Sequence, residues 1–284
     1  MPFDVAFTLR PGASIKDFGS FFASLGARPP VSLPRTRAPA GRRPRSHEWA
    51  ILNDLRRRTH QVTIDALQDA MALASALDGH PEVEWAERPD HEYASPHDLL
   101  LGPHDPEQGH WAAAPDGVDM AAAWSRFPNP TASRRARVHL LERSLPPPPF
   151  GDPFEGVSLT HLGGDTASGA HALMTLGVLA AGHHDASICG AVPTAQFFLY
   201  APNGTPPSLA SVDARLNDIT ARVQQGDVVL IELQYCVSGT YYPLTVIPLV
   251  RAAIAEFEQR GATVIVPTGN SHVHLADLHL HQPT

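Results

Sequence analysis

Apolar runs and amphipathic stretches alternate along the second half of the chain. Four short segments rich in Val, Ile, Leu and Phe predict strands at residues 137–142, 196–200, 227–233 and 262–267. Three segments between them carry apolar residues at helical spacing and predict helices at 171–181, 209–223 and 246–259. Strands with little alternation are buried on both faces, so the pattern predicts an α/β fold with a parallel sheet flanked by helices.

The first 90 residues follow a different pattern. Residues 3–10 alternate apolar and polar side chains as a half-buried strand does, and a second short strand is predicted at 83–87. Helical spacing predicts helices at 15–25, 48–58 and 64–77. The strands at either end with helices between them describe a small α+β domain.

The region between these two patterns is rich in proline and glycine. Residues 91–115 contain Pro96, Pro103, Pro106 and Pro115 and are predicted to form a linker. The chain therefore divides into an α+β domain at 1–90, a linker at 91–115 and an α/β domain at 116–284.

Composition excludes several classes of function. The formal net charge of −8 argues against a nucleic-acid-binding protein, which needs a basic face. No run of apolar residues is long enough to span a membrane. The segment Met-Pro-Phe-Asp-Val lacks the features of a secretory signal, so a cytoplasmic location is the default expectation. The two cysteines, Cys189 and Cys236, are predicted to be small buried apolar residues.

Ligands of parallel sheets bind beyond the carboxyl ends of the strands, and three polar residues follow such ends. Glu142 ends the first strand of the α/β domain, His171 opens the next helix, and Asn270 follows the last strand. An acid, an imidazole and a carboxamide at one sheet edge could serve acyl transfer, as the orienting group, the base and the oxyanion donor. Taken alone, Glu142 could be a solvent-facing carboxylate and Asn270 a turn residue. No cofactor or metal is expected for this chemistry.

These residues lie in segments that resemble the subtilisin-like serine peptidases. His171-Ala-Leu-Met-Thr-Leu-Gly177 is similar to the helix that follows the family's catalytic histidine, and Gly190-Ala-Val-Pro193-Thr-Ala195 to its Gly-Val-Ala-Pro-x-Ala turn. The order of strand, helix, strand and Gly269-Asn270 also matches the family. Val83-Glu84-Trp85-Ala86-Glu87 resembles the last strand of an inhibitory propeptide.

The resemblance implies a fold, an activity and a role for each site residue. It implies a serine endopeptidase domain preceded by a propeptide-like domain, with a peptide or protein as substrate or partner. His171 would take the proton from the nucleophilic serine, Glu142 would orient the imidazole, and Asn270 would donate to the oxyanion.

Three departures from the family pattern change this expectation. Glu142 stands where the family has aspartate, and Ala172-Leu173 replaces its Gly-Thr. The Gly-Thr-Ser-x-Ala-x-Pro motif that carries the nucleophile occurs nowhere in the sequence. We therefore expect a truncated or partial peptidase that is inactive as given. The alternative is a complete, non-catalytic pseudopeptidase that binds or regulates other proteins.

Further alternatives come from other residues. Ser168 and Ser271 are the nearest serines that could replace the missing nucleophile. The cluster His272, His274, His279 and His281 could bind zinc or nickel, or could simply be an exposed tail. A truncated parallel sheet would also expose an apolar edge or face, which predicts self-association or poor solubility.

Overall fold

A computed structural model describes residues 3–24, 30–33, 47–64, 67–87, 91–94, 108–113, 115–126, 136–151, 154–166, 169–182, 188 and 190–271. Its larger sheet is parallel and has the strand order β12-β9-β6-β8-β7. These strands are β6 (Arg137–Leu141), β7 (Ser158–His161), β8 (Gln196–Tyr200), β9 (Val228–Ile231) and β12 (Thr263–Ile265). Four of them confirm predicted strands, whereas β7 was not predicted.

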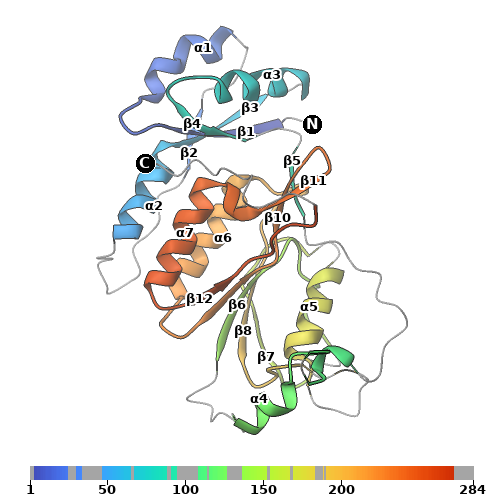
Figure 1. Cartoon of the computed structure of the whole chain (residues 1–284). Helices are drawn as coiled ribbons and strands as arrows, with labels where there is room; N and C mark the ends of the chain where they lie inside the picture. The colour runs from blue at the N-terminus through green and yellow to red at the C-terminus, as the bar shows by residue number, and fades with distance from the viewer. Residues whose placement is uncertain are drawn as a thin grey trace.

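Helices cover both faces of this sheet, which confirms the predicted α/β fold (Figure 1). Helix α5 (Ala170–Ala180) packs on one face, against Val138 and Leu140. Helices α6 (Leu209–Arg222) and α7 (Pro248–Gln259) pack on the other face, against Leu141 and Ile231. Alternate residues of β6 therefore point to opposite helical layers, which is why the buried strands read as continuous apolar runs.

The first domain contains a four-stranded antiparallel sheet with the order β2-β3-β1-β4. Its elements are β1 (Phe3–Leu9), a 3₁₀ turn (Ile15–Phe18), α1 (Gly19–Ser24), β2 (Val31–Ser32), α2 (His47–Arg58), β3 (Thr59–Ile64), α3 (Leu67–Asp78) and β4 (Val83–Ala86). The α+β architecture agrees with the sequence pattern. The helix predicted from residue 64 was wrong at its start, because Val62, Thr63 and Ile64 are β-branched and complete β3.

The predicted linker at 91–115 requires a correction. It begins with a strand, β5 (His91–Ala94), which pairs antiparallel with β10 (Gln234–Val237). Strand β11 (Thr240–Pro243) pairs with the other edge of β10, so a three-stranded sheet joins this segment to the α/β domain. A 3₁₀ turn (Gly109–Trp111) and α4 (Met120–Arg126) follow. Another 3₁₀ turn (Leu244–Val246) precedes α7.

A buried ion pair fastens the first domain to the α/β domain. Helix α2 packs against α7, and Leu52 and Leu55 of α2 join the core cluster that contains Leu216 of α6. Within this interface Arg56 donates to both carboxylate oxygens of Asp213, at 2.7–3.0 Å, and both side chains are fully buried. Removing one partner would leave the other as an uncompensated charge away from water.

Arg56→Leu should lower the free energy of unfolding by about 3–5 kcal/mol, because it leaves the Asp213 carboxylate buried without its partner. The double variant Arg56→Leu/Asp213→Leu should recover much of that loss, since apolar side chains tolerate burial. Urea denaturation followed by circular dichroism measures both effects.

The control is Arg57→Leu in the same helix. Arg57 pairs with Asp54 at 2.9 Å, but the two side chains are 58% and 43% exposed. Its removal should therefore cost about 1 kcal/mol or less. Equal losses for Arg56→Leu and Arg57→Leu would contradict the structural role of the buried pair.

A second buried polar network surrounds the His139 side chain of β6. Its Nε2 lies 3.0 Å from the Asp227 carboxylate and its Nδ1 3.0 Å from the Tyr200 hydroxyl. Burial lowers the pKa of His139, although the hydrogen bond and charge of Asp227 oppose this shift. Burial also raises the pKa of Tyr200, so its hydroxyl stays protonated and donates to the neutral imidazole.

Stability should fall as the pH drops below the ordinary histidine pKa of about 6.5. The unfolded chain then binds a proton at position 139 that the folded chain, with its lowered pKa, still excludes. Burial lowers the pKa of His60 as well, and that residue contributes in the same direction. Urea midpoints measured between pH 7.5 and 5.5 should decline less steeply for His139→Gln than for the wild type. Identical slopes would contradict this assignment.

Candidate functional site

Glu142 lies at the carboxyl end of β6, in the middle of the parallel sheet. Its backbone N–H donates to the Tyr200 carbonyl of β8 at 3.0 Å. On the other side of β6, the N–H of Glu232 donates to the Leu141 carbonyl at 2.8 Å. The chain leaves β6 toward β7 and β8 on one side and reaches β9 on the other, so Glu142 occupies the point where ligands of open parallel sheets bind.

His171 is the second residue of α5, and local backbone geometry fixes where that helix begins. Gly169 precedes the helix with a φ of +51°, and a Cβ atom there would lie 2.2 Å from the Pro146 nitrogen. Its N–H donates to the Ser144 hydroxyl at 3.1 Å. Because Ser144 follows Glu142 by two residues, this contact holds the start of α5 beside the end of β6.

Glu142 and His171 form a direct pair, as their predicted roles require. The Nδ1 atom of His171 lies 3.0 and 3.1 Å from the two oxygens of the Glu142 carboxylate. Thr175, one helical turn later, donates its hydroxyl to the same carboxylate at 2.9 Å. Glu142 is fully buried, so the interpretation of this residue as a solvent-facing carboxylate is wrong.

This geometry selects one tautomer of the histidine. A carboxylate accepts the proton of Nδ1, so the neutral imidazole carries its lone pair on Nε2. His171 is half-buried, with 18% of its side chain exposed. A fixed tautomer at a partly open position is the arrangement that a general base requires.

A second carboxylate, Glu232, lies at the same sheet edge and was not recognised from the sequence. Burial and the negative charge of Glu142 raise the pKa of Glu232, and His171 opposes the shift. The signal in the sequence is a single acidic residue, Glu232, inside the apolar stretch 228–233. Polar residues that interrupt a buried strand near its carboxyl end are candidates for the site.

Asn270 lies in the loop after β12, and its side chain is exposed. Its backbone N–H donates to Oε1 of the buried Gln234 at 2.7 Å. Gly269 has a φ of +98°, and a Cβ atom there would lie 2.6 Å from the Tyr241 carbonyl oxygen, so the loop requires glycine at this position. The role of Asn270 as an oxyanion donor stays a prediction.

Of the two serines considered as replacement nucleophiles, the structure describes only Ser271. The Ser271 hydroxyl accepts the backbone N–H of Tyr241 at 2.7 Å and so helps to attach its loop to β11. Ser168 lies outside the described residues.

The structure does not describe the histidines considered as metal ligands. The four histidines between 272 and 281 lie outside the described residues, and so does Cys189. Among the residues that the structure describes, no three His, Cys, Asp or Glu side chains gather as a metal site would need. Cys236 is buried, as predicted.

Comparison with known proteins adds no family assignment. No family model matches the chain, and no curated protein matches its sequence. Within the described ranges, none of the helices has the length and apolar character needed to cross a lipid bilayer. The resemblance to subtilisin-like peptidases therefore stays a prediction, and the geometry of Glu142 and His171 must carry any functional argument.

Thr175→Val should lower the free energy of unfolding by about 1.5–3 kcal/mol, because it removes a hydrogen bond to a buried carboxylate. Thr175→Ser keeps the hydroxyl and should lose clearly less. Urea denaturation at pH 7.5 measures both variants. If serine and valine are equally well tolerated, Thr175 does not support the Glu142 charge.

Proposed function

We propose that this chain carries the acid and the histidine of a subtilisin-like serine endopeptidase, preceded by a propeptide-like inhibitory domain. The observation that carries the proposal is the hydrogen-bonded pair of Glu142 and His171 at the carboxyl end of the central strand. The chain alone is proposed to be inactive, because it lacks the family's nucleophile motif. The peptide bond is the proposed target.

Each residue has a defined role in the proposed reaction. His171 accepts the serine proton on Nε2 during attack on the peptide carbonyl and then delivers it to the leaving amine. The Glu142 carboxylate holds the imidazole and stabilises its charged form. Asn270 donates to the oxyanion of the tetrahedral intermediate.

The first domain supports the proposal through the strand that follows it. Strand β5 is added to β10 as an antiparallel partner, with Ala94 opposite Gln234 and His91 opposite Val237. Extended peptides bind to sheet edges in this way. The chain direction leads β5 toward Gln234, which is two residues from Glu232, and therefore toward the site. This pairing supports the proposal that the first domain occupies the substrate-binding site of its own chain.

One set of observations favours the alternative, a pseudopeptidase that binds peptides without cleaving them. Ala172 of α5 is fully buried in the core, and Leu173 is 37% exposed at the surface. Both residues depart from the family pattern, as does the glutamate at position 142. A partial sequence would explain the missing serine motif, but it would not explain these substitutions.

Reading the gene beyond codon 284 separates the two candidates. A downstream Gly-Thr-Ser-x-Ala segment in frame supports the endopeptidase, and the extended protein should then hydrolyse casein. His171→Ala or Glu142→Ala should reduce that rate by on the order of 10⁴-fold or more. His110→Ala, at an exposed position in a 3₁₀ turn, is the control and should leave the rate unchanged.

The 284-residue chain itself provides the complementary test. It should neither hydrolyse casein nor react with a fluorophosphonate probe. Labelling that disappears in His171→Ala would contradict the proposed inactivity. An in-frame stop codon directly after Thr284 would overturn the endopeptidase and leave the peptide-binding alternative.

A further inference from the structure

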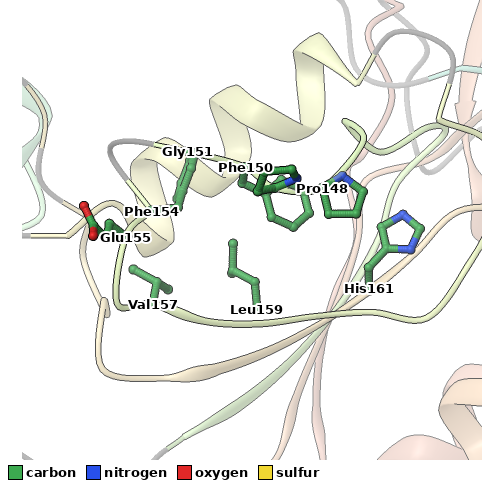
Figure 2. Close-up of a pocket in the computed structure, with 9 residues that line it drawn as sticks. Pro148, Phe150, Gly151, Phe154, Glu155, Val157, Leu159 and His161 are labelled. Carbon is green, nitrogen blue, oxygen red and sulfur yellow. The ribbon is translucent and has the colours of Figure 1, made fainter.

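An apolar pocket of about 490 Å³ lies between β7 and the connection from β6 (Figure 2). Phe150, Phe154 and Leu159 form much of its walls. The Nε2 atom of His161, in the same lining, is buried and does not face the open space. The described lining therefore supplies no buried side-chain donor that would select a ligand. A more directed contact is found in the loop after β12.

Gln234, the first residue of β10, holds the loop that carries Asn270. Its side chain is fully buried, and its Oε1 accepts the backbone N–H of Asn270 at 2.7 Å. A second contact comes from β11, where the backbone N–H of Tyr241 donates to the Ser271 hydroxyl at 2.7 Å. These two contacts fasten consecutive residues of the loop to the β10–β11 hairpin.

Gln234 also pairs with the strand that follows the first domain. Its backbone lies opposite Ala94 of β5 on one side and opposite Pro243 of β11 on the other (Figure 1). Pairing on both edges restricts the backbone dihedral angles of Gln234 and, with them, the direction of its side chain. A strand at the β5 edge is thereby linked, through one residue, to the loop that carries Asn270.

The chemistry of Gln234 indicates that it serves the position of the loop more than the stability of the fold. Its Nε2 is buried and has no hydrogen-bond partner among the residues that the structure describes. An unpaired buried donor costs about 1–3 kcal/mol, which a methionine of similar size would not incur. A polar side chain that fixes a loop at a cost in stability is expected where function needs that loop in one place.

We propose that Gln234 is a positioning residue, which couples the β5 edge of β10 to the Asn270 loop, so that an extended strand at this edge orders the loop. The strand is β5 itself or a peptide bound in its place. The catalytic meaning of this coupling rests on the proposed function, in which Asn270 donates to the oxyanion. The coupling itself needs no nucleophile and is measured on the 284-residue chain.

Amide exchange at Asn270, followed by ¹H–¹⁵N NMR of the full chain, tests the contact. Gln234→Met removes the acceptor at similar volume, so this amide should exchange about fivefold faster, the effect of one neutral hydrogen bond. The melting curve should change little, because the unpaired Nε2 donor is removed at the same time. Gln234→Glu keeps an acceptor oxygen and should keep the wild-type rate. Gln234→Met carries the test if the buried glutamate prevents folding.

A second experiment tests the link to β5. Glu92→Pro/Tyr93→Pro removes the N–H groups of two neighbouring residues, one of which faces β10 because N–H directions alternate along a strand. The Asn270 amide should then exchange at a rate that approaches that of Gln234→Met. A peptide with the sequence of residues 90–97, added in excess to this variant, should restore the wild-type rate.

The matched control is Val31→Pro/Ser32→Pro in β2, an edge strand of the first domain's sheet, and it should leave the Asn270 rate unchanged. A melting curve verifies that each variant folds. An unchanged Asn270 rate in Gln234→Met overturns the positioning role. A response to Gln234→Met without a response to the proline pair in β5, or without restoration by the peptide, overturns the coupling. A stop codon after Thr284 overturns the endopeptidase but leaves these measurements valid, so the two proposals fail separately.

Discussion

The arrangement of the α/β domain depends on a carboxylate that is buried at the end of its central strand. A buried charge is tolerated only when donors surround it, and Glu142 obtains two of its donors from α5. His171 and Thr175 are four residues apart, so they share one helix face and can reach the same carboxylate. This requirement fixes both the rotation of α5 and its starting point, which Gly169 and Ser144 hold beside the strand.

The opposite face of the sheet is organised by a second buried charge. Asp213 of α6 obtains its partner, Arg56, from a domain that lies 157 residues earlier in the sequence. The pair orients α2 on the helical layer formed by α6 and α7, while β5, the strand that follows this domain, pairs with β10. Ionic and backbone contacts thus anchor the first domain at two places, and apolar packing fills the area between them. The ion pair and the strand pairing therefore fix the position of the first domain, and the buried apolar surface stabilises its attachment.

The sequence predicts the elements whose signal is local and misses those that depend on partners. Residues 196–200 are recognisable as a strand because their apolar run leaves no alternative. The hairpin of β10 and β11 was missed, although Ser238 and Gly239 have φ values of +49° and +76° and form a turn typical of hairpins. The pairing of Glu142 with His171 could be predicted from strand ends. The pairing of Arg56 with Asp213 could not, because no local pattern relates two helices in different domains.

The glutamate at position 142 shows why a departure from a family pattern must be judged by geometry. A side chain longer by one methylene could misplace the imidazole, and a displacement of about 1 Å is enough to impair catalysis. In the structure both carboxylate oxygens lie within 3.1 Å of Nδ1, a normal hydrogen-bond distance. The longer side chain therefore reaches His171 without losing the pairing, and Thr175 restricts the added freedom. Glutamate at position 142 therefore fits the proposed role of orienting His171, and the proposed activity depends on whether a nucleophile can reach Nε2 of His171.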